Sequence, residues 1–384
     1  MNLIYLDHSA TSPVRREVLD AMLPYLERSF GNPSSIHRLG REARAAMEEA
    51  RERVATALGA KRQEIVFTSG GTEADNLAIL GRVRAALRAG ARAGVAVSAI
   101  EHKAVLEPAA QAAREGAETV VLAVDTRGVL DMGALDEALR TRPSLVSVMW
   151  GNNEIGTLQP VVEIAKRCEA AGVDFHTDAV QAVGRERVRV DEAGCAMLTL
   201  SGHKIGAPKG SGALYVRTGV ELVPLVYGGG QERGVRPGTE SVAHAVALAT
   251  ALELAVREQE SEAKRLRELR DRLQDAIVTE IPDAVVNGGG APRLPHVLNV
   301  SFPGLDQEAL LVSLDMEGIA VSSGSACQSG SVEPSHVLTA IGRPGTEEAS
   351  VRFSLGRTTT AAEIDAVAGR MPGIIARLRE FAEK

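Results

Sequence analysis

The sequence is poor in aromatic residues and in cysteine. Aromatic side chains make up 3% of the 384 residues, against 45% for all hydrophobic residues, so the core must be built from aliphatic side chains and alanine. There are three cysteines, Cys168, Cys195 and Cys327, without the C-x-x-C spacing of a zinc or redox motif. This usage fits a reducing compartment and argues against a disulfide framework. Any role for a cysteine is therefore individual.

Long apolar runs and an excess of basic residues are also missing. No uninterrupted apolar stretch reaches the roughly 18 residues needed to span a bilayer, and residues 1–7 lack the basic and apolar regions of a secretion signal. The 43 lysines and arginines against 50 aspartates and glutamates leave a net charge of −7, which provides no general attraction to nucleic acid or anionic membranes. We therefore expect a cytoplasmic protein that binds neither nucleic acid nor membrane.

Short apolar runs alternate with helical periodicity along most of the chain, which predicts an α/β fold with a largely parallel sheet and helices on both faces. A long helical region at about 241–277 separates this part from a second α/β set, and we place a boundary there. The predicted strands of the first set are 64–68, 94–98, 119–123, 144–149, 173–176 and 196–200, and those of the second are 297–301, 319–321 and 350–354.

A lysine follows the strand 196–200 closely, in the stretch Ser201-Gly-His-Lys204. Lysine is rarely buried without a partner, so an ammonium group at the end of a core strand should be neutralised, paired or used covalently. The alternative is a lysine on a turn whose ammonium reaches solvent, which is the commoner case for an arbitrary lysine. The surrounding sequence has to decide between the two.

Four other predicted strands also end in polar residues. Ligands bind beyond the carboxyl ends of strands in open parallel sheets, so these residues should meet at one edge. They are Ser69-Gly-Gly-Thr72, Glu101-His-Lys103, Gly151-Asn-Asn-Glu154 and Thr177-Asp-Ala-Val-Gln181. The first leads into a helix, whose free N–H groups and dipole suit a phosphate, although Gly-Gly before a helix is more often a tight turn. No P-loop or dinucleotide-binding glycine motif accompanies it.

A phosphate site, a lysine, an aspartate and a histidine at one sheet edge indicate pyridoxal phosphate as cofactor. Lys204 would hold its aldehyde as a Schiff base, and Asp178 would pair with the pyridine N–H so that the ring withdraws electrons from the substrate Cα. Gln181 can hydrogen-bond the phenolic oxygen, and His102 can lie on the ring face as an acid or base. The alternatives are a helix N-cap for Asp178, and a cap or a satisfied core histidine for His102.

The order of these motifs resembles that of the cysteine desulfurases. The matching motifs are Leu6-Asp-His-Ser-Ala-Thr11, Glu101-His-Lys103, Asn152-Asn-Glu-Ile-Gly156, Asp178-Ala-Val-Gln181, Ser201-Gly-His-Lys204, Ser322-Ser-Gly-Ser-Ala-Cys327 and Ser354-Leu-Gly-Arg357. The series favours the covalent role of Lys204 over the turn alternative. The resemblance implies a fold type I pyridoxal-phosphate transferase with a mostly parallel seven-stranded sheet flanked by helices. It also implies an N-terminal segment at 1–13 that packs with the small domain, a large cofactor-binding domain at 14–254 and a small C-terminal α/β domain at 255–384.

The resemblance also assigns the site residues. Besides Lys204 and His102, it implies that the cofactor is bound by Asp178, Asn153 and Gln181, with Gly71, Thr72, Ser201 and His203 at the phosphate. Thr239 would reach the phosphate of the other subunit, which makes a homodimer a requirement for a complete site. Arg352 would bind the substrate carboxylate as a bidentate pair, with Asn153 also at the substrate.

Cys327 stands in the Ser/Gly-rich stretch 322–331, whose composition predicts a mobile loop. The resemblance implies that the enzyme takes sulfur from L-cysteine, leaves L-alanine and holds the sulfur as a persulfide on Cys327. The acceptor would then be an iron–sulfur scaffold, or a pathway that thiolates tRNA or a cofactor. No intrinsic metal is expected, although Cys327 could serve as a transient iron–sulfur ligand. Cys168 and Cys195, in apolar contexts, are expected to be inert core thiols.

Two departures from the family pattern leave alternatives open. His8 and Ser12 stand where tyrosine and threonine are more usual, and we expect them to be peripheral to catalysis. The sequence ends at Lys384 without the longer tail that some members use to dock a scaffold, so the acceptor stays undetermined. Other readings are a selenocysteine lyase or aminotransferase on the same scaffold, or a binding module without turnover. Lys204 together with Cys327 argues against the last.

Overall fold

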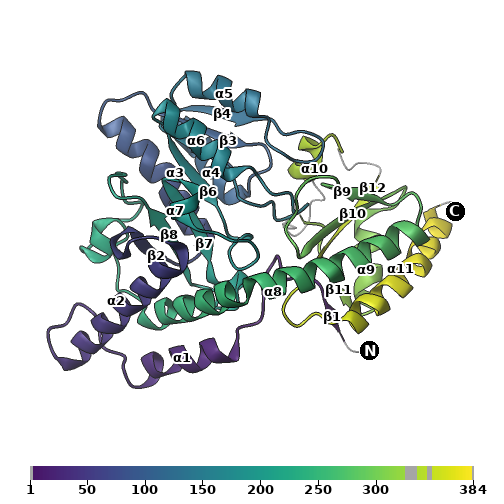
Figure 1. Ribbon diagram of the computed structural model, residues 1–384, viewed down its shortest axis with the longest axis horizontal. Coiled ribbons are helices and arrows are strands. Elements are labelled where there is room, and N and C mark those ends of the chain that lie inside the picture. The colour runs from purple at the N-terminus through teal and green to yellow at the C-terminus, as the bar shows by residue number, and fades with distance from the viewer. Residues whose placement is uncertain (1–2, 325–334, 344–347, 383–384) are drawn as a thin grey trace.

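The computed structural model describes residues 3–324, 335–343 and 348–382, and its larger part is built on a seven-stranded sheet (Figure 1). The strand order is β2-β8-β7-β6-β5-β3-β4. These strands are β2 (Ile65–Thr68), β3 (Gly94–Ser98), β4 (Glu118–Leu122), β5 (Leu145–Ser147), β6 (Asp174–Asp178), β7 (Met197–Ser201) and β8 (Gly212–Val216). Neighbours run parallel except at β8, which is antiparallel to both β2 and β7. The predicted mostly parallel sheet is confirmed.

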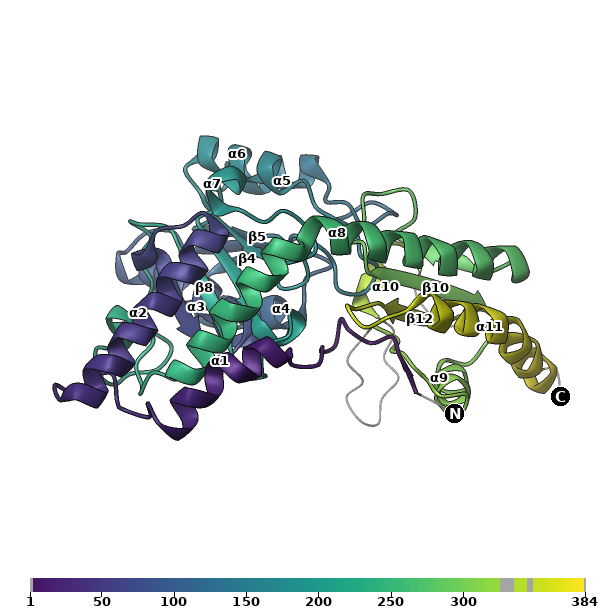
Figure 2. The same ribbon diagram turned by 60° about the horizontal axis from the view of Figure 1, so that its bottom comes forward.

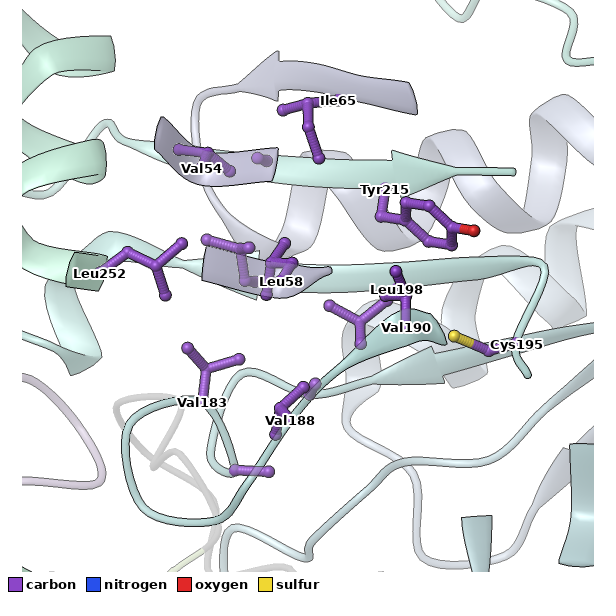
Figure 3. Packing of buried hydrophobic residues seen from close by; sticks show 14 of the residues in the cluster. Val54, Leu58, Ile65, Val183, Val188, Val190, Cys195, Leu198, Tyr215 and Leu252 are labelled. Atoms are coloured by element: carbon purple, nitrogen blue, oxygen red, sulfur yellow. The ribbon is translucent and has the colours of Figure 1, made fainter. Parts of the chain in front are cut away.

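Helices cover both faces of this sheet, as its nearly continuous apolar strands require. One face packs against α3 (Gly71–Arg88) and α4 (Lys103–Arg114). The opposite core is formed with α1 (Arg16–Glu27), α2 (Arg38–Leu58), α5 (Met132–Arg140), α6 (Val161–Ala171), α7 (Val190–Ala193) and the first part of α8 (Val242–Glu280). Figure 3 shows part of this core, with Leu58 of α2 drawn between Leu252 of α8 and Leu198 of β7. The layers hold the strand ends in fixed positions.

The long helix α8 belongs to two hydrophobic cores. Its 39 residues span about 58 Å at 1.5 Å per residue. Its buried residues from Val242 to Ala255 pack with the seven-stranded sheet, and those from Leu266 to Ile277 pack in a second core. Figures 1 and 2 both show α8 running from the larger part of the molecule into the smaller one.

The second core surrounds a three-stranded antiparallel sheet in the order β12-β10-β9. Its elements are β9 (Val285–Asn287), β10 (Val297–Pro303), β12 (Glu348–Ser354), α9 (Gln307–Met316) and α11 (Ala361–Ala382). The N-terminal β1 (Ile4–Tyr5) pairs in parallel with β11 (Ile319–Ala320), and Ile4 and Leu6 lie in this second core. The chain therefore starts in the smaller part and crosses to the larger one within its first residues.

Several elements were not predicted from the sequence. The strands β1, β8 and β9, the helix α10 (His336–Ala340) and the short 3-10 helices η1 (Arg62–Glu64), η2 (Gly202–Lys204) and η3 (Gln231–Gly234) are short, so their patterns are weak. The stretch with Cys327 is described only up to Gly324, so the predicted mobile loop lies largely outside the described residues. Within the described ranges, no helix is both long enough and apolar enough to cross a membrane.

Candidate active site

A cavity of about 520 Å³ lies at the carboxyl ends of the parallel strands, where ligands bind in open sheets. It is lined by residues that follow β5, β6 and β7, by the first turns of α3 and α4, and by a side chain from β12. The structure brings ten predicted residues to this wall: Gly71, Thr72, His102, Asn153, Asp178, Gln181, Ser201, His203, Lys204 and Arg352. The two parts of the molecule therefore close one site together.

Lys204 lies in η2, directly after β7, and its ammonium is not free in solvent. Nζ donates to the backbone oxygens of Ser9 and Ala10 at 2.6 and 2.8 Å. Burial, together with the neighbouring Arg352, lowers the pKa of Lys204 to about 8, although Asp178 and Asp7 act in the opposite direction. A lysine with this pKa has an appreciable neutral fraction near neutral pH, and only the neutral amine can attack an aldehyde. The geometry is not that of a lysine on an exposed turn.

Asp178 is the last residue of β6 and lies buried at the cavity wall. Its Oδ1 accepts a hydrogen bond from the backbone N–H of Val180 at 2.8 Å, whereas Oδ2 has no hydrogen-bond partner among the described residues. Burial raises the pKa of Asp178, against the nearby positive charges of His102 and Lys204. The alternative of a helix N-cap is wrong, because residues 180–182 lie in a turn and the next helix is α7. Oδ1 closes a local turn, and the second oxygen is available to a cationic donor.

His102 both caps a helix and lines the cavity. Its Nδ1 accepts from the backbone N–H of Ala104 at 3.0 Å, at the start of α4. Burial, aided by Lys204, lowers the pKa of His102, so the neutral ring is favoured despite Asp178. Because Nδ1 is engaged as an acceptor, Nε2 is the nitrogen that can exchange a proton with a ligand.

The start of α3 also lines the cavity. Gly71 and Thr72 are its first residues, and their N–H groups stand at the positive end of the helix dipole. The Ser201 hydroxyl is buried and has no partner among the described residues. A Cβ added at Gly71 would lie 3.0 Å from Val180 Cγ2, so a larger residue here would have to push the valine side chain aside. His203, the fourth predicted residue here, has Nδ1 3.2 Å from Thr11 Oγ1.

Gln181 and Asn153 both line the cavity, and both already make contacts within the protein. Gln181 Nε2 donates to Ser9 O at 3.0 Å, and its Oε1 lies 3.4 Å from His296 Nε2, so the protein already uses part of this side chain. The backbone oxygen of Asn153 accepts from Arg352 Nη1 at 3.0 Å. The amide protons that remain on the two side chains are what a ligand could use.

Arg352 comes from β12 and is buried at the cavity, with Asp7 as its ion-pair partner. Its Nη2 lies 2.7 Å from Asp7 Oδ1, and the two side chains are 5% and 21% exposed. Asp7 stood in one of the sequence motifs but was given no role there. The contact between Asp7 and Arg352 spans 345 positions of the chain, so no local sequence pattern could have predicted it.

Buried acids around the site were also missed. Glu101 is fully buried, which raises its pKa to about 8 even though it accepts from the Ser98 hydroxyl and from Met149 N at 2.8 Å. Asp75 lines the cavity four residues after Gly71, and its Oδ1 lies 3.6 Å from His176 Nε2. That helical spacing is a signal that could have pointed to Asp75, because it lies on the same face of α3 as the glycine.

Two predicted residues are not at this wall in the single chain. Thr239 is exposed in the segment before α8 and does not line the cavity. Cys327 lies outside the described residues. The other two cysteines are buried and free, and burial raises the pKa of both thiols to about 12, which makes them poor nucleophiles. Cys195 is one of the core residues in Figure 3.

Three groups that line the cavity fit pyridoxal phosphate. The amine of Lys204 suits its aldehyde, Asp178 Oδ2 suits its pyridinium N–H, and the unpaired Ser201 hydroxyl beside the start of α3 suits its phosphate. A buried lysine of lowered pKa and a buried aspartate at the strand ends of such a sheet are the arrangement of a fold type I pyridoxal-phosphate enzyme.

Comparison with known proteins gives the family. Residues 4–367 match the family described as aminotransferase class-V, and the chain belongs to this family. It is 47% identical to the cysteine desulfurase IscS of Dictyoglomus turgidum over 99% of this chain and 96% of the relative. It is 49% identical to a cysteine desulfurase of Trichormus azollae, over 100% of this chain and 95% of the relative. A solved NifS-like protein superimposes with a TM-score of 0.90 at 34% identity, covering 98% of this chain and 100% of that one. The cofactor of the enzyme is pyridoxal 5′-phosphate.

Proposed function

We propose that this protein is a cysteine desulfurase, which converts L-cysteine into L-alanine and transfers the sulfur to a thiol of the enzyme. The observation that carries the proposal is the grouping of Lys204, Asp178, His102 and Arg352 around one cavity. Together these residues can bind an amino acid by its amine and its carboxylate. Full-length relatives at 47% and 49% identity bear the name cysteine desulfurase, which supports this substrate.

The protein groups divide the chemistry among them. The cofactor supplies an aldehyde that captures amines and a pyridinium ring that draws electrons from the substrate Cα. Lys204 provides the amine that retains the cofactor, and Asp178 holds the proton on the ring nitrogen. His102 exchanges protons at Nε2, and Arg352 fixes the substrate by its carboxylate.

Cys327 is the proposed sulfur acceptor on the enzyme. Its thiolate attacks the sulfur of the bound cysteine, an S–S bond forms and the C–S bond breaks, and the electron pair of that bond with a proton completes L-alanine. The flanking residues support this role: Gly324 and His336 both line the cavity, and the Ser335 hydroxyl donates to Glu154 Oε2 at 2.6 Å. The described residues on both sides of the stretch that carries Cys327 therefore lie at the site.

We also propose that the enzyme is a homodimer in which Thr239 completes the phosphate site of the other subunit. Large apolar side chains exposed on one chain support an interface. They are Leu19, Leu23, Leu26, Phe30, Ile36, Val226 and Tyr227, which belong to α1, to the segment that follows it and to the segment before η3.

The sulfur acceptor beyond the enzyme is a scaffold for iron–sulfur clusters, or a pathway that thiolates tRNA or a cofactor. The IscS-type relatives support a sulfur-transfer role of this kind. The buried free thiols of Cys168 and Cys195 support work in a reducing compartment such as the cytoplasm.

The experiment is a single turnover of the purified holoenzyme with L-cysteine, with L-alanine and protein-bound persulfide as the two readouts. Wild type should form both in equal amounts. Cys327→Ser should keep the cofactor absorbance but form neither product, because a serine hydroxyl is scarcely ionised near neutral pH. Cys195→Ser is the matched control and should form both. The proposal fails if Cys327→Ser retains wild-type turnover, or if L-selenocysteine but not L-cysteine releases alanine.

A further inference from the structure

Residues 7–11, the N-terminal strap, lead from β1 toward α1, and Ser9 and Ala10 of the strap line the cavity. It contacts the two cations of the proposed mechanism: Lys204 through the backbone oxygens of Ser9 and Ala10, and Arg352 through Asp7. The proposed function explains both cations, but it gives no reason for a carboxylate at Asp7.

Asp7 occupies part of the surface that Arg352 would offer to a substrate. Arg352 Nη2 is 2.7 Å from Asp7 Oδ1, and Nη1 donates to Asn153 O at 3.0 Å. Its Nε is buried and has no partner among the described residues. The guanidinium therefore meets an incoming carboxylate with one negative charge already beside it.

The backbone keeps Asp7 in this place. The backbone carbonyl oxygen of Asp7 accepts from the Tyr5 hydroxyl at 3.0 Å and from the backbone N–H of Ala10 at 3.0 Å. The Asp7 backbone also forms a parallel bridge with Ser354 of β12. Arg352 lies two residues before Ser354 on the same strand. The pair is therefore fixed from both sides by backbone contacts.

We propose that Asp7 is a positioning residue that holds Arg352 in place and weakens its attraction for carboxylates, so that it sets the affinity for L-cysteine and L-alanine alike. The inference rests on the proposed carboxylate-binding role of Arg352. Two carboxylates that share one guanidinium in a partly buried site repel each other. The product carries the same carboxylate as the substrate, so an arginine without this counter-charge would retain L-alanine and slow its release.

The test is the dissociation constant of the holoenzyme for L-alanine, measured from the cofactor absorbance, in wild type and in Asp7→Asn. Asparagine keeps an oxygen that accepts from Arg352 but removes the charge. We expect L-alanine to bind about tenfold more tightly, which corresponds to about 1.4 kcal/mol. L-alaninamide, which has the amine but no carboxylate, measures any effect of the lost charge that acts through Lys204, and its affinity should change much less than that of L-alanine.

Asp174→Asn is the matched control. Asp174 also pairs with an arginine at 2.7 Å, Arg82, and its side chain is 19% exposed, close to the 21% of Asp7. It begins β6, at the opposite end of the strand from Asp178. Its loss of charge should leave the affinity for L-alanine unchanged.

The outcomes separate this inference from the proposed function. If Asp7→Asn binds L-alanine within twofold of wild type, or more weakly, the inference is wrong. The same holds if L-alaninamide shifts by the same factor. Arg352→Gln tests the underlying role: it should bind L-alanine no better than L-alaninamide. If Arg352→Gln still prefers the carboxylate, the proposed role of Arg352 fails as well.

Discussion

Burial shifts the pKa values of two residues at the candidate site in opposite directions. It lowers the pKa of Lys204 to about 8 and raises that of Glu101 to about 8. The cause is the same, because a buried environment disfavours the charged form of either group. Both residues therefore have a larger neutral fraction near neutral pH than an exposed lysine or glutamate.

The pKa of Lys204 predicts how the apoprotein takes up its cofactor. Only the neutral amine reacts with the aldehyde, so the rate of incorporation should rise about tenfold per pH unit up to about pH 8 and then level off. A lysine with the ordinary value of 10.5 would give a rate that still rises at pH 10. The measurement is the initial rate of cofactor trapping by borohydride. Lys204→Ala should trap none at the site, and a rate that rises beyond pH 9 would contradict the assignment.

Glu101 should reduce stability as the pH rises. Its pKa is higher in the folded protein than the ordinary 4.5, so the folded state holds the proton more tightly than the unfolded chain. The contribution to stability is then complete below about pH 4.5 and is lost as the pH rises toward 8. In Glu101→Gln this loss is absent, so the fall in unfolding free energy between pH 5 and pH 9 should be smaller by on the order of 1–3 kcal/mol. Urea denaturation at the two pH values measures it, and identical changes in both proteins would refute it.

A buried ion pair holds the segment that leads to Thr239. Arg51 of α2 binds Glu232 of η3 through two contacts of 2.6 and 2.8 Å, and their side chains are 3% and 2% exposed. Glu232 and Arg233 have φ values of 46° and 58°, a left-handed conformation that costs energy in residues other than glycine. The pair therefore keeps a strained turn in place beside the sheet.

Removal of the charge on Glu232 should destabilise this element. Glu232→Gln removes the buried counter-charge of Arg51 and leaves only the half-exposed Glu48, 3.2 Å from Arg51 Nε, and we expect a loss of about 3 kcal/mol in unfolding free energy. Glu253→Gln is the matched control. Glu253 pairs with Arg53, which lies on α2 like Arg51, but the Glu253 side chain is 44% exposed. It should cost less than about 1 kcal/mol. Equal losses in the two variants, measured by urea denaturation, would mean that the buried pair does not anchor the segment.

At the scale of the whole molecule, the site is shared between the two hydrophobic cores and, by our proposal, between two chains. Asp178 ends a strand of the seven-stranded sheet and Lys204 lies in η2 directly after β7, whereas Arg352 comes from the three-stranded sheet. Thr239 is exposed on the single chain. If its phosphate loses one hydrogen bond from a neutral donor, the cofactor should bind roughly tenfold more weakly.

Mixed dimers test whether Thr239 acts on the partner. Thr239→Ala alone should weaken cofactor binding about tenfold, and Lys204→Ala alone should be inactive. When the two variants are unfolded and refolded together, each mixed dimer regains one complete site, with Lys204 from one chain and Thr239 from the other. At a cofactor concentration that occupies most wild-type sites but few Thr239→Ala sites, activity should therefore recover toward half of wild type in the mixed dimers. A mixture no more active than its components would place Thr239 in its own chain or outside the site.

Several features follow from the sequence alone. Strand and helix periodicity is local, so β2, β3 and β7 could be predicted within one or two residues. The carboxyl ends of parallel strands converge at one edge, so the residues that follow them can be grouped from their positions along the chain. That rule places His102, Asp178 and Lys204 in one cavity.

The tertiary structure decided what depends on how the two cores pack against each other. The pairing of Asp7 with Arg352 spans 345 positions, and the bond of Lys204 to Ser9 spans 195, so no local window of sequence contains either contact. The pKa values of Lys204 and Glu101 depend on the depth at which packing buries them. The antiparallel β8 between β2 and β7 is likewise a choice of partner strands, made by long-range pairing and not by the five residues of the strand.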